Sequence, residues 1–348
     1  MKFDVIIATC NRKQSLMILV NQLLSCSKLP ENIIIVDSSE TFNHNIVNIN
    51  LVKYIQSNHQ NQPYQRYVGF LASKSEILIY LDDDMRILDN ECFNKILSFY
   101  QNKNIVGVQP NFRYVHNFFD NKMPKSKTRQ LAKKNLFLKF LKFLSGSPNI
   151  NNGKFWLAGI RGNKPKNGEI IQWFSGPIFS AKKNFLYLDF NFSILDFYEI
   201  SLGKAEDAIL GFTLSRQGDL LYLSEELFAH DDQDDSIYSL DFASHAFRVA
   251  HSRLYLSFEY ARLINFSKIL AFLHFNLYIF GRIGSMALNQ FIDYKPSRKL
   301  FIKGYLKGYY KALKDFNKLL NYDNGVNWKK EAIDEISLNF QFKSQIKD

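Results

Sequence analysis

The sequence predicts an α/β protein with an open, mostly parallel sheet, followed by a helical C-terminal region. In the first half, short apolar β-branched runs alternate with helical patterns, which is typical of βαβ units. From about residue 238 onward the pattern is mainly helical and strongly aromatic. The 348 residues, 46% of them hydrophobic, are enough for a large core, so we expect a folded globular protein.

Five segments of the first half are predicted strands, at residues 4–8, 32–36, 52–56, 77–81 and 105–109. Apolar residues repeat at helical spacing between them, at positions 16, 19, 20, 23 and 24 and again at 68, 71 and 72. Open α/β sheets bind ligands beyond the carboxyl ends of their strands. We therefore expect a site built from residues 9–12, 37–39 and 82–84.

The alternation stops between about residues 112 and 168, where a basic segment and a loop rich in Ser, Gly, Pro and Asn at 145–153 indicate an insertion. A strand is predicted again at 170–174, followed by a Gly176-Pro177 turn and another strand. A helix is expected to begin near Ala205, and a further strand at 220–223.

The formal net charge of +11 predicts attraction to anions such as nucleic acid, acidic lipid headgroups or phosphorylated substrates. The excess is concentrated in residues 122–142, which contain no acid. The basic residues are Lys122, Lys125, Lys127, Arg129, Lys133, Lys134, Lys139 and Lys142. Leu and Phe residues alternate with them, so the segment is either a face for anionic lipid or a solvated helix.

The N-terminal residues and the cysteines predict the cellular compartment of the protein. The first residues lead straight into a strand pattern without the features of a secretory signal, and the three cysteines show no metal-ligand spacing. We expect a cytoplasmic protein, or one at the inner face of the cytoplasmic membrane.

Residues 269–289 are apolar apart from Arg282 and a few polar groups, among them His274 and Asn276. A spanning helix needs about 20 predominantly apolar residues. Arg at its centre costs roughly 2.5–3.5 kcal/mol on insertion scales. We therefore expect a helix that packs in the protein or lies on a membrane surface.

Three consecutive acids, Asp82, Asp83 and Asp84, end the apolar strand 77–81. Adjacent carboxylates repel each other, so a cation is expected to compensate them. Mg²⁺ and Mn²⁺ bind one or two carboxylates and share their other positions with substrate phosphates. A solvated acidic turn is the alternative.

Two further motifs carry acids or histidine. Glu206 and Asp207 open an amphipathic helix, where acids also suit the helix dipole, and only their position downstream of the acidic strand end favours a catalytic role. His230 follows the strand at 220–223. A lone histidine is either a metal ligand or a satisfied polar group, and the residues alone leave both open.

In order and spacing, these motifs resemble family 2 glycosyltransferases of the GT-A fold over about residues 1–235. The matching residues are Ala8-Thr9-Cys10-Asn11-Arg12 after the first strand, Asp37 after the second, Asp82-Asp83-Asp84 after the fourth, and Glu206-Asp207 downstream. The resemblance implies a nucleotide-binding half at 1–110, an insertion or acceptor region at 111–168 and an acceptor half at 169–235. The helical region at 236–348 would serve a membrane surface or oligomerisation.

The resemblance also implies roles for single residues. The nucleotide-sugar would contact Ala8, Thr9, Asn11, Arg12, Asp37, Arg66, Asp82 and Asp83, with Asp37 accepting hydrogen bonds from the base. Asp84 would be the direct metal ligand, with His230 near it. Asp207, or with less support Glu206, would be the general base. Trp173, Ser175 and Gly176 would form the acceptor side, although a tight turn explains Gly176 as well.

The implied activity is inverting transfer from a UDP- or dTDP-sugar to a saccharide hydroxyl, with Mn²⁺ or Mg²⁺ as cofactor. Acceptors would include lipid-linked saccharides, as in bacterial O-antigen or capsule assembly. The charge that develops on the leaving nucleoside diphosphate needs a cation, and the incoming hydroxyl needs a base. The motifs supply an acidic group for each task.

Other classes fit less well. A dinucleotide-binding dehydrogenase needs Gly-x-Gly-x-x-Gly, but residues 8–17 contain no glycine, which also excludes the Gly-rich loop of a sugar-phosphate nucleotidyltransferase. No aromatic and basic motif favours nucleic acid as a partner. A processive synthase would carry Gln-x-x-Arg-Trp, which is missing. The remaining alternative is a non-catalytic scaffold or membrane-surface protein on the same fold.

Overall fold

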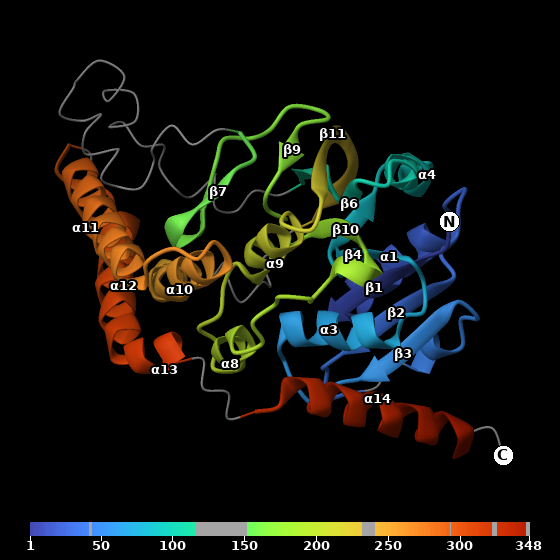
Figure 1. Ribbon diagram of the computed structural model, residues 1–348. Helices are drawn as coiled ribbons and strands as arrows, with labels where there is room; N and C mark the ends of the chain where they lie inside the picture. The colour runs from blue at the N-terminus through green and yellow to red at the C-terminus, as the bar shows by residue number, and fades with distance from the viewer. Residues whose placement is uncertain (42–43, 116–151, 232–240, 293, 322–325, 346–348) are drawn as a thin grey trace.

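The computed structural model describes residues 1–41, 44–115, 152–231, 241–292, 294–321 and 326–345. The basic segment 122–142 and nearly all of the loop 145–153 lie outside these ranges. Figure 1 shows a sheet with helices packed against it, an arm of helices at one end, and the last helix returning to the other end. The predicted α/β class with a helical C-terminal region is confirmed.

Nine strands of the described residues form one mixed sheet in the order β3-β2-β1-β4-β10-β6-β11-β5, with β9 paired to β11. They are β1 (Phe3–Thr9), β2 (Asn32–Asp37), β3 (Val52–Gln56), β4 (Ile77–Asp82), β5 (Met85–Ile87), β6 (Ile105–Tyr114), β9 (Ile170–Ile171), β10 (Ile178–Lys182) and β11 (Asp219–His230). The first four strands are parallel, as are β6 and β11, whereas β10 lies antiparallel between β4 and β6. A separate hairpin joins β7 (Phe155–Trp156) to β8 (Ile160–Arg161).

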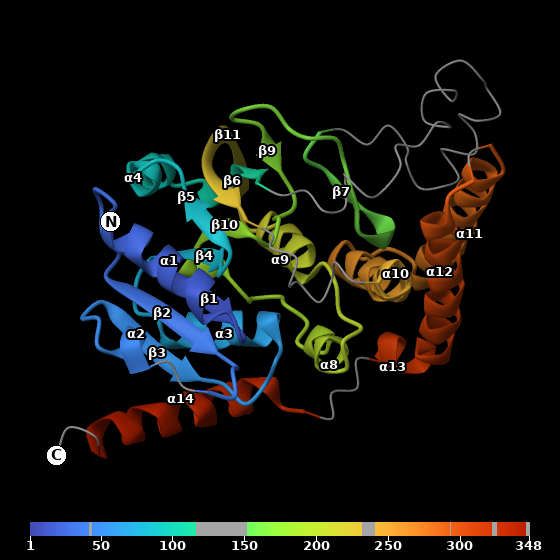
Figure 2. The same cartoon turned by 180° about the vertical axis from the view of Figure 1, so that it is seen from behind.

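Helices cover both faces of the sheet (Figures 1 and 2). They are α1 (Lys13–Leu24), α2 (His44–Val47), α3 (Gln62–Ala72), α4 (Cys92–Ser98), α8 (Ile194–Glu199), α9 (Glu206–Leu214), α10 (Phe242–Leu263), α11 (Lys268–Ile292), α12 (Pro296–Lys314), α13 (Phe316–Asn321) and α14 (Trp328–Gln345). Short 3₁₀ turns are η1 (Phe99–Gln101), η2 (Leu157–Gly159) and η3 (Lys183–Phe185).

The central strands are apolar on both sides because each side packs against helices. In β1, Ile6 faces the core that contains Val68 of α3, whereas Val5 and Ile7 face the core that contains Leu19 of α1. The sequence pattern of continuous apolar runs therefore predicted buried strands correctly. It fails at 170–174, where pairing stops at Ile171.

Residues 172–174 leave the sheet because the chain packs closely against α9 instead. A Cβ atom on Gly211 of α9 would overlap the backbone of Trp173 and Phe174, so only glycine permits this approach. Phe174 is fully buried and stacks on Phe179 of β10 at 4.7 Å between ring centroids. Core packing thus replaces strand pairing in this segment, and it leads into the turn at Gly176.

The last helix returns to the N-terminal half. Figures 1 and 2 both show α14 lying along α3 and β3, far from α11 and α12. The backbone N–H of Asn58 donates to Glu335 at 2.6 Å, and Asn339 bonds both backbone groups of Gln56 at 3.0 and 3.1 Å. The described helices of the C-terminal region therefore contact both ends of the preceding α/β fold.

Two glycines allow α12 to approach α10 closely. A Cβ atom on Gly304 would overlap the carbonyl oxygen of Ala243, and one on Gly308 would overlap that of Phe247. We expect Gly304→Ala to lower the free energy of unfolding, since overlap costs roughly 1–3 kcal/mol and alanine's helix propensity returns at most about 1 kcal/mol.

Urea unfolding followed by circular dichroism checks this prediction. Gly284→Ala on α11 is the matched control, because nothing lies within 4 Å of a Cβ built there. We expect the control to be neutral or slightly stabilising. Equal unfolding midpoints for the two variants would contradict the close approach.

Candidate active site

Strand register brings the predicted residues together at the carboxyl edge of the sheet. Ala8 lies beside Asp82, and Thr9 lies beside Asp37. Asn11 then adopts a left-handed backbone conformation with φ 58°, which asparagine tolerates better than most residues. Its N–H donates to Ser39 Oγ at 2.7 Å, which fixes the turn before α1.

Thr9 and Arg12 hold two of the three acids. Thr9 Oγ1 donates to Asp83 at 2.7 Å, while Arg12 donates to Asp83 at 3.1 Å and to Asp84 Oδ2 at 2.6 Å. Burial and the charge of Asp84 still raise the pKa of Asp83 to about 7. Burial also raises the pKa of Asp82, so two of the three carboxylates are incompletely compensated by the arginines around them.

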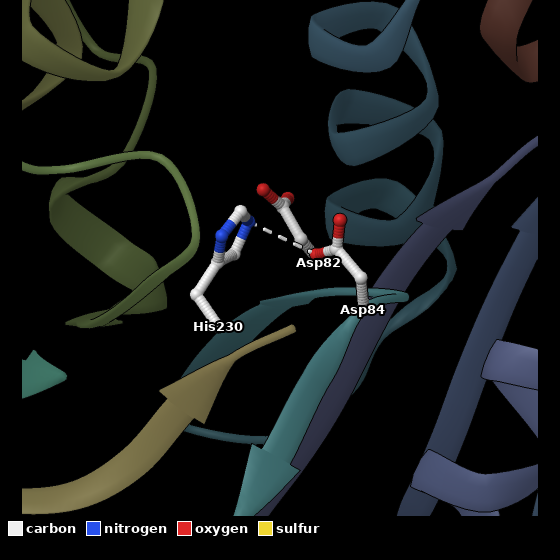
Figure 3. A group of neighbouring side chains, drawn as sticks. All are labelled: Asp82, Asp84 and His230. Carbon is white, nitrogen blue, oxygen red and sulfur yellow. Dashed lines mark ion pairs between the residues drawn. The ribbon is translucent and has the colours of Figure 1, made fainter. Parts of the chain in front are cut away.

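Asp82, Asp84 and His230 form a candidate metal centre. One ligand atom from each lies within 4.8 Å of the others, and Figure 3 shows the three side chains converging from β4, the turn after it and β11. His230 Nε2 lies 3.1 Å from Asp84 Oδ1, a buried oxygen that makes no hydrogen bond of good geometry to any described residue. Two carboxylates and an imidazole suit a divalent cation such as Mn²⁺. The sequence left open whether His230 is a metal ligand or a satisfied polar group, and the structure places its ring beside Asp84. Asp82, which was predicted to contact the nucleotide-sugar, also lies within this candidate metal centre.

Arg66 of α3 joins the two acidic motifs. It is buried, and it donates to Asp82 Oδ1 at 2.7 Å, to Glu206 Oε1 at 2.6 Å and to the carbonyl oxygen of Gly176 at 2.8 Å. A buried guanidinium needs such partners, because an unpaired charge away from water is costly. Gln62, one turn earlier, also donates to Asp82 Oδ1 at 2.8 Å.

Gln65 of the same helix ties the strand ends together. Its Nε2 donates to the carbonyl oxygens of Thr9 at 2.9 Å and of Val36 at 2.8 Å. These bonds hold the ends of β1 and β2 beside α3. Gln62, Gln65 and Arg66 thus form a polar edge of α3. Arg66 was a predicted nucleotide-sugar contact, whereas Gln62 and Gln65 were not singled out, although their helical spacing could have indicated a shared face.

Glu206 and Asp207 have different surroundings at the start of α9. Glu206 accepts hydrogen bonds from Arg66 and from the Tyr198 hydroxyl, and burial raises its pKa. Asp207 Oδ2 pairs with Arg161 at 3.3 Å and would lie 3.5 Å from a Cβ on Gly176. Glu206 therefore forms a buried ion pair with Arg66, whereas Asp207 lies next to the turn at Gly176.

The other predicted residues border the same region. Asp37 is buried and accepts from Ser39 N–H at 2.8 Å and from the Tyr54 hydroxyl at 2.5 Å. The backbone N–H of Ser175 donates to Gln109 Oε1 at 2.7 Å. The Arg161 guanidinium lies over the Trp173 ring, 5.3 Å from its centroid. Arg161 was not a predicted site residue, because it falls in the segment that the sequence indicated as an insertion.

The fold and the site together define a nucleotide-sugar glycosyltransferase with the GT-A fold. Residues 4–161 match the family model described as Glycosyl transferase family 2. This part of the chain belongs to glycosyl transferase family 2, and the protein is a glycosyltransferase. The implied fold and family are confirmed.

The structure of TarS agrees on the fold. Residues 1–349 of S. aureus TarS align over 99% of this chain and 92% of TarS 1–349, with 15% identity and a TM-score of 0.52. The mannosyltransferase PcManGT from Pyrobaculum calidifontis, solved with GDP-Man and Mn²⁺, aligns over 96% of this chain and 87% of its own, with 11% identity and a TM-score of 0.47. No curated protein sequence matches the chain significantly.

Proposed function

We propose that the protein transfers a sugar from a UDP- or dTDP-sugar to a saccharide hydroxyl, with inversion at the anomeric carbon and a divalent metal ion. One observation carries the proposal: the buried Arg66 bridges Asp82 of the candidate metal centre and Glu206, which precedes Asp207. A cation site and a separate carboxylate are thus held on two sides of one guanidinium. Inverting transfer needs these two groups, because the leaving group and the acceptor lie on opposite faces of the sugar.

Asp82, Asp84 and His230 would hold Mn²⁺ or Mg²⁺, which when bound supplies positive charge next to the leaving nucleoside diphosphate. Arg12, which reaches Asp83 and Asp84 from the start of α1, adds a fixed cation beside the same position. Asp37, oriented by Ser39 and Tyr54, would accept hydrogen bonds from the nucleotide base. Carboxylate oxygens have lone pairs left for such bonds.

Asp207 would take the proton of the acceptor hydroxyl. It lies next to Gly176, where the lack of a side chain leaves the backbone accessible to a sugar. Glu206 would act indirectly, because Arg66 and Tyr198 hold its two carboxylate oxygens closely, whereas the contacts of Asp207 with Arg161 are longer, at 3.3 and 3.5 Å. The pairing therefore favours Asp207 over Glu206 as base.

A panel of UDP-, dTDP- and GDP-sugars tests the proposal by release of the nucleoside diphosphate with Mn²⁺, with Mg²⁺ and with chelator. We expect turnover of a UDP- or dTDP-sugar that chelation abolishes. NMR of the product should show the inverted anomeric configuration. Turnover of GDP-sugars alone, or turnover unaffected by chelator, would contradict the proposed donor or the proposed metal dependence.

We also propose that the enzyme works at the inner face of the cytoplasmic membrane, on an acceptor of surface polysaccharide assembly, and that α11 and α12 contact the lipid. Among the described residues, α11 is the one helix long and apolar enough to cross a bilayer. The helix packs against α10 and α12, and much of the rest of its surface is exposed. The exposed apolar residues of α11 include Ile269, Leu270, Leu273, Leu277 and Phe280.

The charge of these two helices suits anionic lipid. The 25 residues of α11 and the 19 of α12 contain eight Lys or Arg and no acid. Exposed lysines Lys299, Lys303 and Lys307 stand on α12 among exposed apolar residues such as Leu300 and Leu306. An apolar stripe with cations beside it is typical of a helix that lies in the membrane interface.

Co-sedimentation with vesicles checks the membrane contact. We expect binding to vesicles that contain anionic lipid, weaker binding as salt increases, and a roughly tenfold or greater loss for the double variant Leu273→Asp/Leu277→Asp. Leu338→Asp, on the exposed side of α14 with a similar exposed fraction, is the matched control. Lack of binding at low salt would contradict the proposal, and so would a change of oligomeric state that accounts for the effect of the double variant.

A further inference from the structure

Four cationic side chains gather near Asp207. This cationic cluster consists of Arg161 from β8, Lys204 from the segment before α9, and Arg248 and Arg253 from α10. Arg161 touches Asp207 itself, at 3.3 Å. The proposed transfer reaction uses Asp207 but assigns no role to the four residues of the cationic cluster.

Backbone contacts hold the cluster in place. Arg253 donates to the carbonyl oxygens of Ala158 at 2.8 Å and of Gly159 at 2.9 Å, just before Arg161 in the chain. Arg248 donates to the carbonyl oxygen of Gly203 at 3.1 Å, next to Lys204. A carbonyl oxygen carries no full negative charge, so these contacts orient the two guanidinium groups without neutralising them.

The field within the cluster is positive. Burial and the charge of Arg248 lower the pKa of Lys204 to about 8, and Asp207 only partly opposes them. Burial, followed by the charges of Lys204, Arg248 and Arg253, lowers the pKa of the neighbouring His245 to about 3. Burial and three nearby cations thus keep this histidine neutral, and an anion placed among these cations would be stabilised by their charge.

Donor groups in the same region have no partner among the described residues. Nε of Arg253 and Nε1 of Trp173 are both buried, and neither makes a hydrogen bond there. Trp173 lies under Arg161, and Arg161 contacts Asp207. Buried donors of this kind are normally satisfied, so they point to a ligand that accepts hydrogen bonds.

We propose that the cationic cluster binds an anionic group of the acceptor, a phosphate or a carboxylate, and thereby places the acceptor hydroxyl at Asp207. This inference rests on the proposed function, since it takes Asp207 to be the acceptor side. The donor diphosphate would bind elsewhere, at the metal ion held by Asp84 and beside Arg12, because Arg66 and Gly176 lie between these residues and Asp207. Arginine suits phosphate and carboxylate alike because its planar fork donates two parallel hydrogen bonds.

A comparison of charged and uncharged acceptors in the transfer reaction tests the proposal. Glycerol 3-phosphate, glucuronic acid and uncharged glucose are compared as stimulators of nucleoside diphosphate release, which also separates phosphate from carboxylate. We expect the concentration for half-maximal stimulation to be at least tenfold lower for at least one anionic compound than for glucose. Lys204→Gln should raise that concentration about tenfold and leave the values for glucose and for UDP binding unchanged, while Lys330→Gln on α14 serves as control.

A second measurement does not depend on turnover. Titration of the metal-free protein with glycerol 3-phosphate and with glucuronic acid, followed by tryptophan fluorescence, should saturate for at least one of them, and Lys204→Gln and Arg248→Gln should each weaken that binding. If this binding is found but no nucleotide-sugar turns over, the proposed function fails and the anion site stands. Binding of neither anion, equal effects on charged and uncharged acceptors, or weakened UDP binding by Lys204→Gln would overturn the inference.

Discussion

Asp207→Asn is expected to lower the rate of sugar transfer by roughly 10²- to 10⁴-fold while nucleotide affinity stays nearly unchanged. Asparagine keeps the size of the side chain and can still contact Arg161, but it cannot accept the proton of the acceptor hydroxyl. Asp207 contacts neither Arg12 nor the acids of the candidate metal centre among the interactions that the structure shows. The loss should therefore appear in kcat.

Single-turnover transfer and calorimetric titration of UDP separate the two quantities. Glu206→Gln is the informative comparison, because Glu206 holds Arg66 and Arg66 holds Asp82. That variant should change donor KM as well as kcat. Asp334→Asn, an exposed acid of α14, controls for loss of a carboxylate in general. If Asp207→Asn turns over at the wild-type rate, Asp207 is not the base.

Much of the site could be predicted because its residues follow strands directly. Apolar runs mark the ends of β1, β2 and β4, and parallel pairing brings those ends to one edge, so Thr9, Asp37 and Asp82 become neighbours. Local sequence carries this information at β1, β2 and β4, because at each of them an apolar run is followed directly by polar residues.

Contacts between distant segments could not be predicted in the same way. Arg66 and Glu206 are separated by 140 positions, and only the packing of α3 against the start of α9 makes them partners. Arg161 lies in a segment whose composition indicated an insertion, yet it reaches Asp207. The segment 172–174 has the composition of a strand, but the contact with Gly211 takes it out of the sheet. In each case a contact between distant segments determines the local structure, and no local sequence pattern encodes that contact.

Asp84→Ala is expected to abolish the gain in nucleotide affinity that Mn²⁺ provides, and to reduce transfer by roughly 10³-fold or more. Asp84 is the acid that contacts both His230, at 3.1 Å, and Arg12, at 2.6 Å, so its loss removes a ligand and leaves Arg12 paired with Asp83.

Titration of UDP with and without Mn²⁺ measures the effect directly, because it does not require turnover. His230→Asn should weaken the Mn²⁺ effect less, since two carboxylates remain in place. Asp89→Asn, an acid a few residues later that pairs with Lys95, should leave it unchanged. If the wild-type protein binds UDP equally well with and without Mn²⁺, the three side chains converge for a structural reason, and Arg12 and Arg66 must by themselves stabilise the leaving diphosphate.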